Sequence, residues 1–239
     1  QRYSIVSFFE SFADIPGVRT VIDDIFVAGS TAEEHDTRLR LVLQPCREIN
    51  LGLNAEKCRF CRSELPYLGH ILSARGLKPD PDKIQAICEL STPSSKADVL
   101  RFLGMANYLA KFCPGLSDAA TPLRQLTQND VPWTWDEVHS RAFQRLKSMV
   151  SSAPVLALYD ASKPVLLSVD ASQHGLGAVL VQDERPVAYA SRTLSPVQQR
   201  YAQIEKEMMA VQFGLERFHQ YVFGQKVTTE TDHKPLLGI

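Results

Sequence analysis

The sequence lacks any uncharged apolar stretch near the ~20 residues that span a bilayer, and its first residues lack a charged-then-apolar signal pattern. We therefore expect an intracellular protein that does not bind membranes. The sequence also lacks a large net charge, because 26 basic and 27 acidic residues give a formal net charge of −1. Bulk electrostatics thus gives no indication of nucleic-acid binding, which would have to depend on local geometry.

A disulfide framework is also missing. The five cysteines, an odd number without a secretion signal, are Cys46, Cys58, Cys61, Cys88 and Cys113. Cys58 and Cys61 form one CxxC pair, but no second pair follows to complete a tetrahedral zinc site. We expect free thiols. A zinc-binding interaction domain stays a third hypothesis, which would require one bound zinc per chain by metal analysis.

The sequence does have enough apolar residues to fold. Its 239 residues are 44% hydrophobic and 22% charged, which predicts one or two ordinary domains at ~100–200 residues each. The turn-rich segment 151–154 places a domain boundary near residue 155. Before it, a helical tail is expected within 1–20, and an apolar strand or hairpin over Val18–Val27.

Short helices and strands are predicted for the first two thirds of the chain. A helix over 31–49 begins with a capping box of Thr31 and Glu34, and Pro45 is expected to bend or end it. A strand over 67–72 enters a turn at 73–76 and returns at Leu77. Further helices are expected around 84–87, from the Ser95 cap to 109, and over 138–150.

Beyond residue 155 the pattern changes to βββαβ. Strands are expected at 164–170, 176–182, 186–192 and 226–232, with a long helix before the last of them. The apolar stripe of this helix is expected to pack on the sheet; it consists of Val197, Tyr201, Ile204, Met208, Val211, Leu215 and Phe218. A right-handed crossover would bring the last strand beside the first.

Acidic residues occur where propensity disfavours them. Asp23 and Asp24 interrupt an apolar run, either as a solvated hairpin turn or as a carboxylate presented to divalent metal ions. Adjacent strand residues point to opposite faces, so at most one of the two is a full ligand without distortion. Asp170 and Asp232 each end a strand, and a helix carboxylate, Glu205 or Glu207, could join them at one pair of metals. Periodicity does not choose between the two glutamates.

Ordered motifs along nearly the whole chain resemble the reverse transcriptase and ribonuclease H region of gypsy-like LTR retrotransposon Pol polyproteins. In order, they are Ile22–Ile25, Thr31–His35, Leu53–Cys58, Tyr67–His70 with Gly76 and Pro79-Asp80, Phe102–Tyr108, Ser152–Leu156, Asp170–Ser172, Ala188–Arg192, Glu205–Glu207 and Thr231–Leu236. The resemblance implies an α+β and α/β fold. It comprises the C-terminal part of the polymerase palm (1–78), small thumb or connection helices (79–154) and a ribonuclease H-like mixed sheet (155–239).

The resemblance implies a multifunctional enzyme of a DNA-integrating polyprotein. Its activities are RNA-directed DNA polymerase, a nucleotidyltransferase, and ribonuclease H, an endonuclease and hydrolase acting by two-metal phosphoryl transfer. The implied catalytic and metal-binding residues are Asp23, Asp24, Asp170, Glu207 and Asp232, with Glu207 thereby preferred to Glu205. The implied primer grip is Tyr67, Leu68, Gly69 and His70. Nucleic-acid contacts are expected from Arg101, Tyr108, Lys111 and Arg192, although solvated charges and core packing explain each of these equally well.

The implied cofactors are two Mg²⁺ or Mn²⁺ ions per active site. The implied partners are an RNA template, a DNA primer, an RNA–DNA hybrid and, in the full-length enzyme, dNTP. The cytoplasm or an element-derived particle is the expected location, with the nucleus as an alternative. The sequence does not define an oligomeric state.

The sequence departs from the family pattern at several places. Val21 stands where the family has a Tyr, and Pro45 falls where relatives continue a helix. The chain is expected to be truncated at both ends, without the first palm Asp and the fourth ribonuclease H Asp. We therefore expect no polymerisation by this chain alone and at most weak residual cleavage. The alternative is a catalytically dead or host-recruited module that binds nucleic acid or protein.

Overall fold

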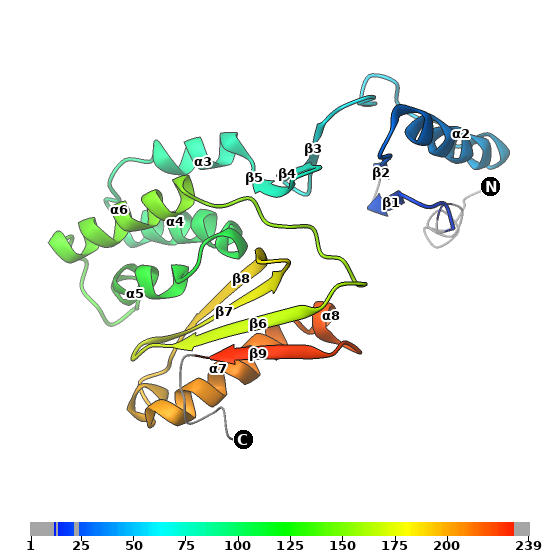
Figure 1. The fold of residues 1–239 in the computed structure, drawn as a ribbon. Coiled ribbons are helices and arrows are strands. Elements are labelled where there is room, and N and C mark those ends of the chain that lie inside the picture. The colour runs from blue at the N-terminus through cyan, green and yellow to red at the C-terminus, as the bar shows by residue number, and fades with distance from the viewer. Residues whose placement is uncertain (1–11, 13, 22–23, 232–239) are drawn as a thin grey trace. The chain divides into compact units, whose positions relative to one another are not determined.

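The computed structural model describes residues 12, 14–21 and 24–231, and the chain divides into an N-terminal unit (1–61) and a C-terminal unit (62–239). Each unit is described by itself (Figure 1). In the N-terminal unit, β1 (Val18–Val21) and β2 (Asp24–Val27) form an antiparallel hairpin, and helix α2 covers Ala32–Glu48. Their small apolar core contains Phe12, Val18, Val42 and Cys46. Most of the helical tail expected within 1–20 lies outside the described residues.

Helix α2 begins as predicted but does not end at Pro45. The Thr31 hydroxyl accepts a hydrogen bond from the Glu34 amide at 3.2 Å, which is the expected N-cap. The helix continues through Pro45 to Glu48. The expectation that Pro45 ends the helix is therefore wrong. Proline removes one donor only, while its carbonyl still accepts from the Ile49 amide at 2.9 Å. Buried Cys46 anchors this last turn in the core.

The C-terminal unit begins with a three-stranded antiparallel sheet. Its strands are β3 (Glu64–Tyr67), β4 (His70–Ser73) and β5 (Gly76–Pro79). The single strand expected over 67–72 is wrong, because Leu68 and Gly69 adopt left-handed φ angles of 45° and 72° and reverse the chain. Two such residues between paired strand ends are a tight hairpin turn. The turn escaped prediction because leucine rarely adopts this conformation.

Helices follow the small sheet. They are α3 (Pro81–Cys88), α4 (Lys96–Tyr108), the 3₁₀ turn η1 (Ala110–Phe112), α5 (Leu116–Leu126) and α6 (Glu137–Ser151). The Ser95 cap is confirmed, since its side chain accepts from the Asp98 amide at 3.2 Å. Helix α5 was not expected, because Pro122 lies inside it. The buried faces of α4, α5 and α6 share one apolar core. Within the described ranges, no helix has both the length and the apolarity that crossing a membrane requires.

The C-terminal part forms the expected βββαβ arrangement. Strands β6 (Val165–Ala171), β7 (Gly175–Gln182), β8 (Arg185–Thr193) and β9 (Val227–Thr231) make a mixed sheet in the order β8-β7-β6-β9. The first three strands pair antiparallel, and β9 pairs parallel with β6 as predicted. The crossover between β8 and β9 contains η2 (Gln198–Arg200), α7 (Gln203–Arg217) and α8 (His219–Val222).

Helix α7 packs on the sheet with a different face from the one predicted. Most of the expected apolar stripe is exposed, by 64% at Val197 and 47% at Met208, although Phe218 is buried. The sheet-facing side instead carries Ala210 and Gly214. A Cβ added at Gly214 would lie 3.0 Å from a methyl of Leu167, so small residues bring the helix backbone close to the strands.

The helical layer contacts the sheet on the face opposite α7 (Figure 1). The Ser117 amide in α5 donates to the Ser191 hydroxyl in β8 at 3.0 Å. Strand β5 is joined to the segment before β6 by two hydrogen bonds of 2.8 Å between Leu77 and Leu156. These contacts fix the small sheet and the helices to the mixed sheet. All five cysteines are free thiols, as predicted.

Gly76 is expected to be essential to this junction. Its φ of +131° is accessible almost only to glycine, and an added Cβ would overlap the Leu156 carbonyl oxygen. Gly76→Ala should therefore lower the free energy of unfolding by about 2 kcal/mol in urea titration. Gly104→Ala is the matched control, because Gly104 lies in α4 with open space around it. The control should raise stability by about 0.5–1 kcal/mol, and equal effects of the two changes would contradict the assignment.

Candidate functional site

The predicted acidic pair at the first hairpin is only partly described. Asp23 and its neighbour Ile22 lie outside the described residues. Asp24 begins β2, pairs with Val21 across the hairpin and has an exposed side chain. Asp24 is therefore accessible to a ligand, and the assignment of both residues as metal ligands stays a prediction.

Two of the predicted acids of the C-terminal part, Asp170 and Glu207, lie at one edge of the mixed sheet. Strands β6 and β9 run parallel with Val169 opposite Thr231, so both end at the same edge. Asp170 is the next residue of β6, and Asp232 follows Thr231 but lies outside the described residues. Open α/β sheets bind ligands at such carboxyl edges, beside strands whose connections diverge.

Glu207 of α7 is held at this same edge. Its side chain is only 2% exposed. The Gln203 amide donates to one carboxylate oxygen at 2.7 Å, and the Thr231 hydroxyl lies 3.4 Å from the other. Gln203 also donates to the Ala171 carbonyl at 2.7 Å, which ties the glutamate to the end of β6. The carboxylate thus lies beside the residues that adjoin Asp170 and Asp232.

Glu205, the alternative carboxylate, has a different environment. It is exposed in the first turn of α7 and accepts a hydrogen bond from the Ala202 amide at 2.8 Å. That bond caps the helix, as expected for a glutamate at the third helical position. The structure therefore separates the two glutamates that sequence periodicity could not.

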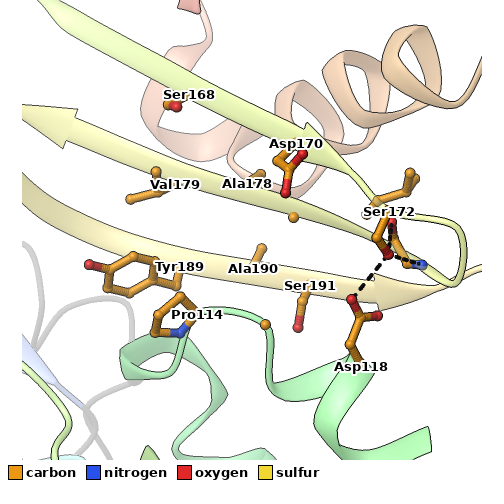
Figure 2. Close-up of a pocket in the computed structure, with 14 residues that line it drawn as sticks. Pro114, Asp118, Ser168, Asp170, Ser172, Ala178, Val179, Tyr189, Ala190 and Ser191 are labelled. Carbon is orange, nitrogen blue, oxygen red and sulfur yellow. Dashed lines mark hydrogen bonds between the residues drawn. The ribbon is translucent and has the colours of Figure 1, made fainter. Parts of the chain in front are cut away.

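Asp170 lines a pocket of about 210 Å³ on the face of the sheet opposite α7 (Figure 2). Its side chain is exposed and shares this face with Ser168, while the alternate residues of β6 are buried toward α7. Glu207, which belongs to α7, does not line this pocket, although its partner Gln203 also bonds to Ala171, the residue after Asp170. In the described part of the chain, no three acidic, histidine or cysteine side chains are grouped as metal ligands.

Asp118 also lines this pocket and was missed by sequence reasoning (Figure 2). One of its carboxylate oxygens accepts from the Ser172 hydroxyl at 3.2 Å. The other is buried without a hydrogen-bond partner and packs so closely on Gly175 that a Cβ there would overlap it. This contact joins α5 to the β6–β7 turn. No sequence signal indicated it, because α5 itself was not expected.

The predicted primer-grip residues form the tip of the β3–β4 hairpin. Tyr67 and His70 are the last paired residues, with the Leu68-Gly69 turn between them. Tyr108, at the end of α4, donates from its hydroxyl to the Leu68 carbonyl at 2.6 Å. A Cβ at Gly69 would overlap that hydroxyl. The turn is therefore held in its left-handed form by α4, while the Leu68 side chain is 57% exposed.

His70, the first residue of β4, is buried beneath the tip of this hairpin. Its ring stacks on Tyr108 with centroids 5.0 Å apart and meets Phe112 edge-on at 5.1 Å. Its Nδ1 atom is buried and lacks a hydrogen-bond partner. Burial, followed by the charges of Lys111 and Lys83, lowers the pKa of His70 to about 4. The imidazole is therefore neutral at physiological pH.

The three cations predicted to contact nucleic acid have partners within the protein. Arg101 forms an ion pair of 2.8 Å with Asp98 and is itself largely exposed. The Lys111 ammonium lies 5.3 Å from the Phe112 ring centroid, and burial lowers its pKa. Arg192 stacks on Phe213 at 5.6 Å. Arg101 and Arg192 are both exposed, and the assignment of these residues to nucleic-acid contacts stays a prediction.

Family models match two parts of the chain. Residues 20–72 match reverse transcriptase (RNA-dependent DNA polymerase), and residues 135–229 match the RNase H-like domain found in reverse transcriptase. A Pol polyprotein from the Drosophila melanogaster transposon opus is 39% identical over 231 residues, covering 90% of this chain and 23% of that protein. The transposon 297 polyprotein of the same organism is 35% identical, over 90% of this chain and 20% of that protein.

A relative from a second organism is also similar. The Tf2-3 polyprotein of Schizosaccharomyces pombe is 34% identical over 91% of this chain and 17% of that protein. The chain thus spans about a fifth of the curated relatives that it matches.

Solved structures share the fold. A foamy viral protease-reverse transcriptase in complex with double-stranded DNA superposes with a TM-score of 0.88 at 21% identity, covering 98% of this chain and 42% of that one. Another, in complex with an RNA/DNA hybrid, gives 0.85 at 21% identity over 95% and 32%. The fold class predicted from the sequence is therefore confirmed.

Proposed function

Because this chain belongs to the Pol polyproteins of LTR retrotransposons, of which it carries part of the reverse transcriptase domain and the RNase H-like domain, we propose that it cuts the RNA strand of RNA–DNA hybrids. The site proposed is the carboxyl edge of β6 and β9. Asp170, Glu207 and Asp232 are its catalytic carboxylates. The structural relatives bound to double-stranded DNA and to an RNA/DNA hybrid make a hybrid a suitable substrate.

The observation that carries this proposal is the environment of Glu207. A buried carboxylate is costly unless a cation or several donors compensate its charge. Glu207 is 2% exposed, and its hydrogen-bond partners, Gln203 and Thr231, are both neutral. Among the described residues, no lysine, arginine or histidine lies within ion-pair distance of it. A cation from solution would supply the missing positive charge.

The donor chemistry fits a hard divalent cation. Carboxylate oxygens are the ligands that Mg²⁺ and Mn²⁺ prefer, and we propose two such ions per site. When bound, a metal pair activates the attacking water and stabilises the leaving oxygen of an in-line displacement. Gln203 orients Glu207 toward the sheet edge, and exposed Asp170 is accessible from the pocket side. The hybrid would be recognised by its backbone and 2′-hydroxyl groups.

Polymerisation is proposed for the whole polyprotein, since this chain spans about a fifth of its relatives. There Asp23 and Asp24 would hold metal ions, while an RNA template, a DNA primer and dNTP are the substrates. Arg101, Tyr108, Lys111 and Arg192 are proposed to contact the nucleic acid. The divisions 1–78, 79–154 and 155–239 are kept as proposed boundaries of the palm, the thumb or connection and the RNase H-like domain.

A cleavage assay tests the proposed function. The chain is incubated with an RNA–DNA hybrid labelled on the RNA strand, with matched double-stranded DNA and with single-stranded RNA. We expect weak cleavage of the hybrid RNA in Mg²⁺ or Mn²⁺, with none in a chelator and none of the other substrates. Salt-sensitive hybrid binding that needs no metal and gives no product would instead support the non-catalytic alternative.

The hairpin tip is proposed as the primer grip, and Tyr108 tests it. Tyr108→Phe keeps the stack on His70 but removes the hydrogen bond to Leu68, which should lower stability by about 1 kcal/mol. Looser positioning of the tip should weaken binding of a primer–template duplex by about fivefold in fluorescence anisotropy. Tyr201→Phe is the matched control, because Tyr201 is exposed. Equal duplex affinity in both variants would count against the grip.

A further inference from the structure

A second pocket, outside the proposed nuclease site, lies between two turns of the C-terminal unit. It has a volume of about 200 Å³ and is bounded by the β4–β5 turn, the β7–β8 turn and the segment before β6. Arg75, Lys163, Gln182, Asp183 and Arg185 supply its polar lining, and we call it the Arg75 pocket. The proposed function assigns nothing to these residues.

The walls of the Arg75 pocket are fixed by hydrogen bonds. The Arg185 guanidinium donates to the Arg75 carbonyl at 2.5 Å, which joins the two turns. Gln182 is 4% exposed and donates to the Asp160 and Lys163 carbonyls at 2.8 Å and 3.2 Å. It also accepts from the Asp160 amide at 2.9 Å. The pocket is therefore formed before any ligand arrives.

The lining carries excess positive charge. Lys163 pairs with Asp183 at 2.6 Å, and this carboxylate raises the pKa of the lysine while the nearby Arg185 opposes it. In the ranges that the structure describes, neither Arg75 nor Arg185 has a carboxylate within ion-pair distance. The adjacent Asp160 is engaged by the hydroxyl and amide of Ser162 at 2.7 Å and 2.9 Å. Asp160 also raises the pKa of Lys163, so both nearby carboxylates act on the lysine, while the guanidinium groups of Arg75 and Arg185 have no ion-pair partner among the described residues.

We propose that the Arg75 pocket binds a phosphate group, supplied either by a nucleic-acid strand or by a free nucleotide. Guanidinium groups recognise phosphate through paired N–H donors. The volume is below the roughly 300–1,000 Å³ of sites that enclose a whole small molecule, so it suits a phosphate with little else.

The position of the pocket favours the strand as the source. Strand β4 has four residues, with the hairpin tip at one end and the Arg75 turn at the other. At ~3.3 Å per residue this is about 13 Å, or about four nucleotide steps at 3.4 Å each. A duplex held at the tip is long enough to reach the pocket. This choice of source rests on the proposed nucleic-acid function, whereas the phosphate site does not.

One double variant and one control test the proposal on the full chain. Arg75→Gln and Arg185→Gln are combined, and Arg217→Ala removes one exposed charge of α7 away from the pocket. Duplex affinity is measured from low to moderate salt. Loss of one phosphate contact should reduce the slope of log K against log salt by about 0.9 and weaken binding about tenfold. The control should keep the slope, and thermal melting checks that every variant folds.

A second arm separates the two sources of phosphate. Inorganic phosphate and a nucleoside monophosphate are titrated while the backbone amide signals of Asp183 and Arg185 are followed by NMR. A slope change in the double variant supports a strand contact. Saturable shifts with free phosphate, lost in the double variant but without any slope change, support a nucleotide-phosphate site.

Failure of each proposal has its own signature. If the double variant changes no slope and free phosphate causes no specific shifts, the phosphate site is overturned. Duplex binding by the unmodified chain would in that case leave the proposed function standing. Absent duplex binding together with retained phosphate shifts would reject nucleic-acid binding and keep the phosphate site.

Discussion

Glu207→Gln is expected to abolish metal-dependent cleavage of an RNA–DNA hybrid, with a loss of more than about 100-fold. Even residues that only support a metal ligand contribute about 10–100-fold, and Glu207 is proposed as a ligand itself. The amide fits the same space and keeps one oxygen that can accept from Gln203, while its NH2 group takes the place of the oxygen that faces the Thr231 hydroxyl, which can itself accept. Loss of activity would therefore report the missing charge. Single-turnover cleavage of labelled hybrid measures it.

Glu207→Gln is not expected to destabilise the protein when metal is absent. Removing an uncompensated buried charge should leave the free energy of unfolding unchanged or raise it. The unmodified chain should gain about 2.7 kcal/mol when metal reaches 100 times its dissociation constant, and Glu207→Gln should lose most of this gain. Thermal melting with and without Mn²⁺ gives both values.

Two further substitutions make the test of Glu207 specific. Glu205→Gln is the control, because Glu205 is exposed and glutamine also caps a helix at this position. It should keep both cleavage and metal stabilisation. Gln203→Ala removes the side chain that joins Glu207 to Ala171 and should weaken metal binding by about 10–100-fold. Equal behaviour of Glu205→Gln and Glu207→Gln would remove the carboxyl edge of β6 and β9 from the mechanism.

Acidification from pH 6.5 to 4 is expected to cost up to about 3 kcal/mol of stability through His70 alone. Burial of the ring, then the charges of Lys111 and Lys83, lowers its pKa from 6.5 to about 4 in the folded protein. The unfolded chain takes up a proton near pH 6.5, whereas the folded chain does so only near pH 4. The unfolded state therefore binds more protons in this window, and stability falls as the pH falls.

His70→Phe isolates this contribution. Phenylalanine keeps an aromatic ring between Tyr108 and Phe112 and also removes a buried nitrogen that has no hydrogen-bond partner. Urea titrations between pH 4 and 7 should show a shallower decline for this variant than for the unmodified protein. His174→Gln is the control, since His174 is exposed. Parallel curves for the His70 variant and the unmodified protein would disprove the shifted pKa.

Local sequence signals predicted those elements whose ends are set by residues close together in the sequence. The caps at Thr31 and Ser95 are examples, since a side-chain oxygen and an amide three residues later suffice to begin a helix. The βββαβ order was equally accessible, because alternation along each strand and the Gly and Pro turns between strands are local. The motifs around Asp170 and Glu207 identified the family without any knowledge of their geometry.

Other features were hidden because they depend on contacts between distant residues. The Leu68-Gly69 turn is stabilised by Tyr108, which lies 40 residues away. The packed face of α7 was misassigned because close approach to the sheet requires Ala210 and Gly214, whereas a periodicity argument favours large apolar side chains. Asp118 meets Ser172 only because an unexpected helix docks on the sheet.

The sequence by itself therefore determined the family, the order of elements in the mixed sheet and the carboxylates worth testing, since motifs and alternation are properties of short segments. Periodicity left Glu205 and Glu207 open and the family resemblance preferred Glu207, whereas only the tertiary structure showed that the two carboxylates differ in burial and hydrogen-bond partners. It also decided that Arg75 and Arg185, 110 residues apart, share one pocket. Such convergence results from packing, which no local pattern encodes.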